Sequence, residues 1–432
     1  MAWDFETEPE FQELLDWAAG FVHDEVEPAD LVVDDPFDRS DPVREAIIPP
    51  LQQAVRDKGL WAAHLGPDLG GQGFGQVKLG LLNEILGGSK CSPVVFGCQA
   101  PDSGNAEVLA HFGTPELKAR YLEPLLAGEV FSCFSMTEPQ GGSDPTAFTA
   151  SAVLDGDEWV INGEKWMSTN ARHASFLVVM AVSEPDNPPH QRASMFVVPA
   201  ETPGIEIVRN VGVYGEAPGH GHHGYVRYTD VRIPRDHLLG DRGGGFVVSQ
   251  VRLGGGRVHH AMRTVGQVRR ALDLMCERAI SRETKGALLS RKQLVQEMIA
   301  ESWLAYQQLR ILVLQTAWKI DKYQDYKRVR GDIAGIKILA PRVLHDVAVR
   351  AVQVHGALGV TDELPLGGMI MSSLSLGIAD GASEVHKVTL SRQVVSGYQP
   401  ASGLFPTGHL PARRAAAERK YADVLGPAGV PT

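Results

Sequence analysis

The sequence predicts an α+β protein of three parts: a helical N-terminal domain, a middle β-barrel domain and a C-terminal four-helix bundle. Two changes in hydrophobic period indicate this order. Apolar residues recur at helical spacing up to about residue 130, gather in short strand-like runs to about residue 240, and return to helical spacing beyond residue 245. We therefore expect domains at residues 1–130, 131–242 and 243–398, followed by a tail at 399–432.

The N-terminal part reads as helices joined by loops. Phe11, Leu15 and Ala18 share one face of a helix, which is the spacing that an amphipathic helix needs. The Pro49-Pro50 pair predicts an interruption, because proline lacks the N–H that an interior helical residue donates.

The middle part reads as many short strands. Asp155-Gly156 and Asn162-Gly163 are dipeptides typical of two-residue hairpin turns, and strand-like residues lie between them. Further strand-like runs, separated by Pro and Gly, follow at residues 175–183, 193–200, 204–211 and 224–234. Strands at such short intervals favour a sandwich or barrel over a parallel α/β sheet.

The C-terminal part reads as long helices. Three apolar stripes step by three or four residues, at 258–279, 294–312 and 336–354, and a last helix begins near Glu384. Pro341 lies inside the third stripe and predicts a kink or a split there. Four long helices indicate a bundle.

Charge and composition exclude several classes of function. The chain has 41 basic and 52 acidic side chains, a net charge of −11, and its first forty residues hold thirteen Asp or Glu with Arg39 alone opposing them. Such a balance argues against nucleic-acid binding. The acidic start and the lack of a long apolar run argue against a signal peptide or a membrane span. We expect a cytoplasmic protein.

Metal and redox sites are not indicated. The four cysteines show no C-x-x-C spacing, so neither a zinc site nor a redox pair is expected. His220, His222 and His223 lie in a glycine-rich loop with no fourth ligand in view, and we expect them to be solvated or packed. His259 and His260 point to different faces of one helix, so at most one lines the core.

Two features could carry chemistry. The glycines Gly141 and Gly142 could let backbone N–H groups converge on an anion, with the Ser143 hydroxyl as a further donor, or they could form a plain surface turn. Asp380 follows small and apolar residues, where a desolvated carboxylate would make a general base. The alternative is that Asp380 caps the helix that begins around Ser383. No P-loop, Rossmann or G-x-S-x-G motif occurs.

Several motifs together resemble the flavin-dependent acyl-CoA dehydrogenases. The segment Phe134-Ser135-Met136-Thr137-Glu138-Pro139 followed by Gly142-Ser143-Asp144 is similar to the signature of that family. Similar segments recur in the family's order, and together they cover about residues 5 to 397: Trp159-Val160-Ile161-Asn162-Gly163 with Lys165-Trp166, Arg282-x-Thr284-x-Gly286 with Gln293, Gln353 to Gly359, and Ala379 to His386.

The resemblance implies FAD as the cofactor. The positions that match flavin-binding residues of the family are Met136, Thr137, Gly142, Ser143, Trp166, Ser168, Thr169, Arg282, Thr284, Gln293, Gln353 and Gly356. From Arg282 onward these positions usually hold the FAD of a neighbouring subunit, which implies a homodimer or homotetramer. Positions that match the substrate side of the site are Ser143, Arg257 and Gly381.

The resemblance also implies a reaction. Asp380 stands where most of the family has its glutamate base, within an ADG-x-x-EVH motif that is similar to a branch with an aspartate base. The implied activity is α,β-desaturation of an acyl-CoA to a trans-2-enoyl-CoA. Asp380 would remove the α-proton while the β-hydride goes to flavin N5, and the electrons would pass to an electron-transfer flavoprotein.

Three departures and two alternatives accompany this prediction. Met167 replaces a second Trp, Lys285 replaces the usual Phe between Thr284 and Gly286, and residues 371–377 lack the basic residues that relatives place there. One alternative is a flavin oxidase of the same fold, similar to nitroalkane oxidase or acyl-CoA oxidase, because an aspartate base suits a more acidic substrate carbon. The other is a homologue that has lost its flavin and binds CoA or a partner.

Overall fold

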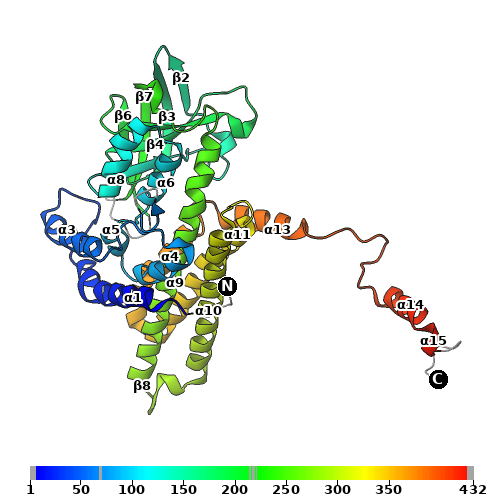
Figure 1. The fold of residues 1–432 in the computed structure, drawn as a ribbon. Coiled ribbons are helices and arrows are strands. Elements are labelled where there is room, and N and C mark those ends of the chain that lie inside the picture. The colour runs from blue at the N-terminus through cyan, green and yellow to red at the C-terminus, as the bar shows by residue number, and fades with distance from the viewer. Residues whose placement is uncertain (1–5, 68–70, 214–215, 217–218, 220, 426–432) are drawn as a thin grey trace.

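The computed structural model describes residues 6–67, 71–213, 216, 219 and 221–425. Figure 1 shows a sheet domain at one end of the molecule and the long C-terminal helices running toward the other, with the N-terminal helices packed alongside. The predicted order of helices, sheet and helices is confirmed.

The N-terminal part consists of short helices and helical turns. They are α1 (Pro9–Phe21), η1 (Val22–Val26), α2 (Glu27–Ala29), α3 (Pro42–Asp57), α4 (Gly75–Leu86), α5 (Ser92–Val95), α6 (Asp102–Phe112), α7 (Pro115–Leu117), η3 (Lys118–Leu122) and α8 (Glu123–Ala127). The interruption predicted at Pro49-Pro50 is wrong, because both prolines lie inside α3. Burial of Ile48 and Val55 anchors this helix to the core on either side of the prolines.

The middle part is a curved sheet of seven strands. They are β1 (Ser132–Ser135), β2 (Ser151–Asp155), β3 (Glu158–Thr169), β4 (Phe176–Val182), β5 (Ala193–Pro199), β6 (Ile205–Val211) and β7 (His223–Pro234). β1 pairs with β4, β4 with β2, β2 with β3, and β3 again with β1, so these four pairings close on themselves as a barrel requires.

The two predicted hairpin turns have different outcomes. Asp155-Gly156 does join β2 to β3, and Asp155 pairs with Glu158. Asn162-Gly163 is not a turn, because it lies inside β3 at a shift of register against β7. The Asn162 side chain instead bonds the backbone and side chain of Asp230 across the two strands.

The alternation of residues along the strands divides the sheet between two cores. Leu177, Val179 and Ala181 of β4 pack inside the barrel, while Phe176, Val178 and Met180 face the N-terminal helices. β4 is therefore buried on both faces and reads as one continuous apolar run.

The C-terminal part contains α9 (Gly245–Ser281), a hairpin of β8 (Glu283–Thr284) and β9 (Ala287–Leu288), α10 (Gln293–Tyr323), α11 (Arg330–His355), α12 (Leu366–Leu376) and α13 (Ser383–Val395). The split predicted at Pro341 is wrong, because α11 runs through it with Pro341 buried. The sequence interpretation also missed α12.

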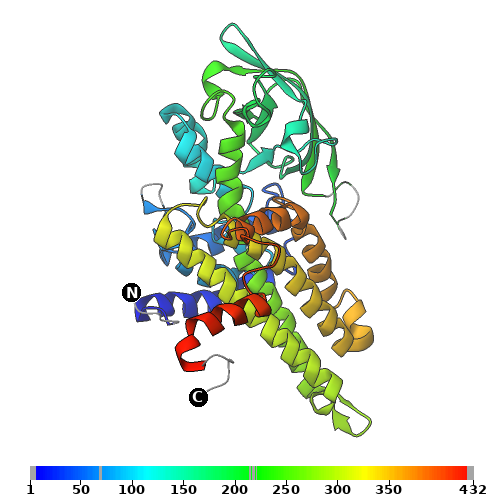
Figure 2. The same ribbon diagram turned by 90° about the vertical axis from the view of Figure 1, so that its right-hand side faces the viewer.

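Helix α9 connects the two ends of the molecule. Figure 2 shows it descending from the sheet domain through the centre of the helices. Val248 near its start packs against the sheet, whereas Met262 and Met275 belong to the helical core. Residues in between, from about 252 to 260, therefore lie at the junction of all three parts.

The chain beyond α13 forms an arm. It carries α14 (Leu410–Lys420) and α15 (Ala422–Leu425), and Figure 1 shows it extending away from the body. Among the described residues, no helix has both the length and the apolar character that a bilayer crossing needs.

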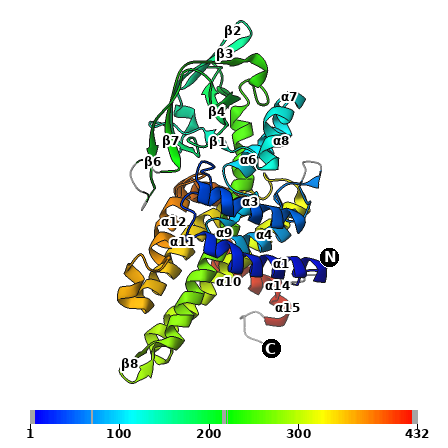
Figure 3. The same cartoon turned by 90° about the vertical axis from the view of Figure 1, so that its left-hand side faces the viewer.

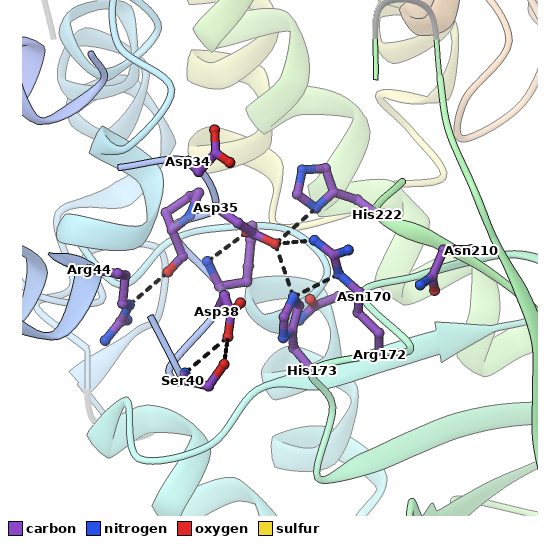
Figure 4. A network of polar contacts seen from close by, with 12 residues as sticks. Asp34, Asp35, Asp38, Ser40, Arg44, Asn170, Arg172, His173, Asn210 and His222 are labelled. Atoms are coloured by element: carbon purple, nitrogen blue, oxygen red, sulfur yellow. Dashed lines mark hydrogen bonds and ion pairs between the residues drawn. The ribbon is translucent and has the colours of Figure 1, made fainter. Parts of the chain in front are cut away.

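A polar clasp joins the N-terminal part to the sheet. Figure 4 shows Asp35 between Arg172, His173 and His222. The Asp35 carboxylate accepts hydrogen bonds from Arg172, from His173 at 2.9 Å and from the Phe37 N–H at 2.9 Å. Burial works to raise the pKa of Asp35, but these hydrogen bonds outweigh it and lower the pKa well below its ordinary value of 3.8.

We expect this clasp to make stability depend on acid pH. Because the pKa of Asp35 is lower in the folded state than in the unfolded state, its carboxylate stabilises the fold fully at pH values above about 3.8. This stabilisation is lost progressively as the pH falls from there toward the folded-state pKa. Asp35→Asn is expected to lower the free energy of unfolding at pH 7 by about 1–3 kcal/mol. Urea unfolding at several pH values checks this. A difference between the two proteins that does not shrink below pH 4 would contradict it.

Candidate active site

Asp380 lies in the loop between α12 and α13, and the backbone of this loop is held from two helices. Lys337 of α11 donates from Nζ to the carbonyls of Leu376 at 2.6 Å and Ala379 at 2.8 Å. Arg257 of α9 donates from Nε to the Asp380 carbonyl at 2.8 Å. Asp380 itself has a φ of 54°, so two cations stabilise a backbone conformation that side chains rarely adopt.

Asp380 does not cap the following helix. The N-cap of α13 is Ala382, and no side chain caps it. The alternative of a simple helix cap is therefore wrong, and the carboxylate is available for another role.

The Asp380 carboxylate faces one side of α9 over three successive turns. Arg252 Nη1 lies 3.8 Å from Oδ1, and His260 Nε2 lies 3.5 Å from Oδ2. Gly256, midway between them, lies so close that a Cβ there would be 3.4 Å from Oδ2. Positions four residues apart share a helix face, so Arg252, Gly256 and His260 form a single seat for this carboxylate.

The charges at this seat favour the ionised carboxylate. Burial works to raise the pKa of Asp380, but the nearby cationic groups on α9 and α11 outweigh it and lower that pKa. Burial lowers the pKa of His260, whereas the neighbouring Asp380 carboxylate works to raise it. Asp380 is thus a largely buried, charged proton acceptor with an imidazole beside it.

Backbone donors flank the carboxylate. None of the described residues accepts a hydrogen bond from the N–H groups of Asp380 or Gly381. Gly381 has a φ of 101°, and a Cβ there would lie 3.0 Å from His386 Nε2, so the close packing of this turn requires glycine. A proton acceptor beside free N–H donors is an arrangement suited to removing a proton next to a carbonyl.

A second set of predicted residues comes together at the ends of β1 and β3. Phe134 pairs with Thr169, the Trp166 backbone N–H donates to the Thr137 carbonyl at 2.8 Å, and Lys165 Nζ donates to the Met136 carbonyl at 2.8 Å. The structure therefore brings together Met136, Thr137, Trp166, Ser168 and Thr169. The Ser168 hydroxyl bonds Ser135 at 2.9 Å within the sheet.

The glycine loop differs from the anion site considered from the sequence. The N–H groups of Gly141 and Gly142 both donate to the Glu138 carbonyl, at 3.1 and 3.4 Å, so they do not converge on an external anion. The turn alternative is correct for these two amides. Ser143 is exposed, and within the described part of the chain its hydroxyl makes no hydrogen bond.

Besides Gly142 and Ser143, five more predicted cofactor residues lie on the surface. Arg282, Thr284 and Gln293 are exposed at the hairpin of β8 and β9. Figure 3 shows β8 at the end of the molecule opposite β2 and β3. Gln353 and Gly356, at the end of α11, are exposed as well. A single chain therefore does not bring the hairpin residues to the site at β1 and β3.

The described histidines contact other side chains of the protein. No group of three or more potential metal ligands occurs among the described residues. His222 lies 3.7 Å from Asp35 and 3.6 Å from Glu216, His223 bonds Thr169, and His220 lies outside the described residues. His259 is buried against His64, while His260 points to Asp380, so the prediction of different faces is confirmed.

Sequence reasoning missed several residues of the site. Arg252, His260 and Lys337 were not predicted to approach Asp380. The spacing of Arg252, Gly256 and His260 was visible in the sequence, but a shared helix face has no functional meaning until the residue opposite it is known. Lys337 comes from another helix, so no local pattern indicates it.

Comparisons with known proteins identify the family. The acyl-CoA dehydrogenase N-terminal, middle and C-terminal domains match residues 8–129, 133–231 and 243–395. Acyl-CoA dehydrogenase FadE2 of Mycobacterium tuberculosis is 41% identical over 354 residues, covering 81% of this chain and 86% of that protein. Human acyl-CoA dehydrogenase family member 11 is 39% identical over 345 residues, but the match spans 79% of this chain and only 44% of that protein.

Solved structures agree with this. A Mycobacterium abscessus chain described as an acyl-CoA dehydrogenase has a TM-score of 0.84 and 36% identity, covering 91% of this chain and all of that chain. A chain in a structure described as the electron transferring flavoprotein of Acidaminococcus fermentans has a TM-score of 0.76 and 26% identity, covering 91% of this chain and 100% of that one. The chain belongs to the acyl-CoA dehydrogenase family of oxidoreductases.

Proposed function

We propose that this protein is an FAD-dependent acyl-CoA dehydrogenase that converts an acyl-CoA thioester to its trans-2-enoyl-CoA, with Asp380 as the base. The observation that carries the proposal is the seat of Asp380. Its side chain is only 16% exposed, nearby cationic groups favour the charged carboxylate, and the Asp380 and Gly381 N–H groups beside it are free.

Each group at this seat has a task in the reaction. The Asp380 carboxylate takes the α-proton of the thioester. The Asp380 or Gly381 N–H donates to the thioester carbonyl and thereby makes that proton easier to remove. Arg257 and Lys337 hold the loop backbone, so that the carboxylate and these donors keep their relative positions.

The residues at the ends of β1 and β3 fit a flavin in part. The Thr137 carbonyl accepts a hydrogen bond from the Trp166 N–H, the Met136 carbonyl accepts one from Lys165 Nζ, and the Ser143 hydroxyl remains open for a phosphate oxygen. When bound there, FAD supplies the acceptor for the hydride that leaves the β-carbon. A second copy of the chain would supply Arg282, Thr284 and Gln293, since they are exposed and remote from these strands.

The reduced cofactor must pass two electrons to an acceptor. We propose an electron-transfer flavoprotein for this role. The likeness to a chain from the structure of the Acidaminococcus fermentans electron transferring flavoprotein supports this choice.

Anaerobic mixing of the FAD-loaded protein with a panel of acyl-CoA thioesters tests the proposed function. We expect at least one thioester to bleach the oxidised flavin band and to yield the enoyl-CoA. A protein that binds FAD but is bleached by no thioester would contradict the proposal. A protein that takes up no FAD would favour the flavin-less homologue.

The lowered pKa of Asp380 also favours one alternative. A carboxylate with a lowered pKa is a weaker base, which suits a substrate whose carbon is more acidic than that of a thioester. A flavin oxidase of this fold would have such a substrate. Turnover in air without another acceptor would favour the oxidase, whereas turnover that needs the flavoprotein acceptor would favour the dehydrogenase.

Assembly of two or four copies follows from the same proposal. Leu294, Trp303, Leu304 and Ile311 of α10 are at least half exposed, and Trp303 and Leu304 line an open apolar groove between α9 and α10. Exposed apolar surface of this extent on long helices is typical of a subunit interface. The exposed hairpin with Arg282 lies at the end of the same two helices.

We expect FAD retention to depend on Arg282. Arg282→Glu is expected to lower FAD occupancy by about tenfold, because it replaces a cation with an anion where a phosphate-bearing cofactor of the neighbouring copy would lie. The flavin absorbance per chain after gel filtration, with mass from light scattering, checks this. Arg291→Glu, which reverses the charge of an exposed arginine shortly after the hairpin, is the matched control. Equal FAD loss in both variants, or none in Arg282→Glu, would contradict the assignment.

A further inference from the structure

Arg252 connects the proposed base to the middle domain. Its side chain is 10% exposed, and its Nη1 lies 3.8 Å from Asp380 Oδ1. On the other side, its guanidinium carbon lies 3.9 Å from the centre of the Phe134 ring. Phe134 is one residue before the end of β1, and Met136 and Thr137 follow directly. One guanidinium thus spans the gap between the base and the strand that leads to the proposed flavin residues.

The orientation of Arg252 is fixed by a chain of hydrogen bonds. Its Nε donates to Asn105 Oδ1 at 3.2 Å, and Asn105 Nδ2 donates to Ser132 Oγ at 2.9 Å. The Asp102 carboxylate accepts from the Ser132 N–H at 2.7 Å. Asn105 and Asp102 belong to α6, and Ser132 begins β1, so the guanidinium is tied to two elements besides its own helix.

We propose that Arg252 is a positioning residue for the reaction, which places the Asp380 carboxylate relative to the flavin side of the site. This inference rests on the proposed function. Arg252 contacts the base and not the reacting atoms. Its planar guanidinium suits this role because it can stack on Phe134, hydrogen-bond Asn105 and face Asp380 at the same time. An ammonium group lacks that geometry.

Other charged groups also face Asp380, and their contributions must be separated from that of Arg252. The titratable groups that face Asp380 or Arg252 are Arg257, His260 and Arg263 of α9, Lys337 of α11, His386 of α13, Cys133 of β1, and Asp102 and Glu107 of α6. Arg257 and Lys337 bind loop carbonyls, whereas Arg252 is the arginine whose guanidinium lies within 4 Å of the carboxylate in the described structure.

The first test is the pH profile of flavin reduction by the thioester that bleaches the wild type. Arg252→Gln is expected to slow reduction about tenfold to a hundredfold and to move the acid limb up by about one unit or more. Arg252→Lys is expected to keep the acid limb at the wild-type pH, because the positive charge remains. Its flavin reduction is still expected to be slow, because the ammonium group lacks the planar geometry of the guanidinium. Added guanidinium ion is expected to restore part of the rate of Arg252→Ala.

A matched control is Arg44→Gln. Arg44 of α3 is also buried and also faces a phenylalanine, at 5.9 Å from the Phe131 ring centre, but its Nε donates to the Pro36 carbonyl and not toward the Asp380 loop. This variant is expected to lose stability with no change in the acid limb. An acid limb that moves equally in both variants would overturn the proposal.

The second test needs no substrate. In urea unfolding of the FAD-loaded protein, the loss of stability in Arg252→Gln combined with Asp380→Asn is expected to be smaller than the sum of the two single losses. Additive losses would overturn the inference even if thioesters bleach the flavin. Conversely, coupling between the two residues in a protein that no thioester bleaches would contradict the proposed function and leave the contact itself established.

Discussion

Asp380→Asn is expected to lower the rate of flavin reduction by an acyl-CoA by about two to four orders of magnitude, which is the usual worth of a positioned general base. The amide keeps the shape of the carboxylate but cannot take the α-proton. The Asp380 carboxylate lies 3.8 Å from Arg252 Nη1 and 3.5 Å from His260 Nε2, and neither of these two neighbours offers a second carboxylate to replace it. Anaerobic stopped-flow absorbance at the oxidised flavin band measures the effect.

Asp380→Glu is the informative companion variant. Glutamate keeps the charge but is one methylene longer. The Asp380 carboxylate already packs closely against Gly256, where a Cβ would lie 3.4 Å from Oδ2, so a longer side chain must shift its carboxylate. A displacement of about 1 Å can cost about a hundredfold in rate, so this variant is expected to bind FAD and remain slow. An Asp380→Asn protein that reduces its flavin at the wild-type rate would exclude Asp380 as the base.

The second large effect concerns stability at the ends of β1 and β3. Lys165→Met is expected to lower the free energy of unfolding by about 3–5 kcal/mol, because it leaves a buried carboxylate without its cation. The side chains of Lys165 and Glu138 are 0% and 1% exposed, and Lys165 Nζ lies 2.8 Å from Glu138 Oε1. The same amine donates to the Met136 carbonyl at 2.8 Å, so FAD retention is expected to fall as well.

An exposed pair in the same sheet provides the control. Arg227 Nε lies 2.9 Å from Glu164 Oε1, with side chains 42% and 38% exposed. Exposed pairs contribute little, so Arg227→Met is expected to lose far less stability than Lys165→Met. Urea unfolding of both variants measures the two losses in free energy of unfolding. Equal losses would show that the buried Lys165–Glu138 pair contributes no more to stability than the exposed pair.

The fold was largely predictable because each part has its own hydrophobic period. Phe11, Leu15 and Ala18 are buried on one face of α1, and the alternation in β4 divides its residues between two cores. The errors occurred where tertiary packing overrides a local signal. Pro341 lies buried in an unbroken α11, and Asn162-Gly163 lies inside a strand because β7 continues to pair alongside it.

The site was predictable only at positions that a motif contains. Asp380 and Gly381 occur together in one short segment, so a motif can indicate both. Their neighbours come from distant parts of the chain. Arg252 lies 128 residues before Asp380, and Asn105 lies 275 residues before it. The packing of α6 against α9 joins Asn105 to Arg252, and Arg252 in turn faces Asp380. The hairpin of Arg282 is a different case, because its proposed partner lies in another copy of the chain.

The most direct measurement of the central claim is single-turnover reduction of the FAD-loaded protein by a reactive thioester labelled with deuterium at the α- or the β-carbon. Removal of the α-proton by Asp380 together with hydride loss from the β-carbon predicts slower bleaching with either label, and release of the α-deuterium to water. Bleaching that is insensitive to both labels, or a removed α-deuterium that is not recovered in the water, would contradict the claim.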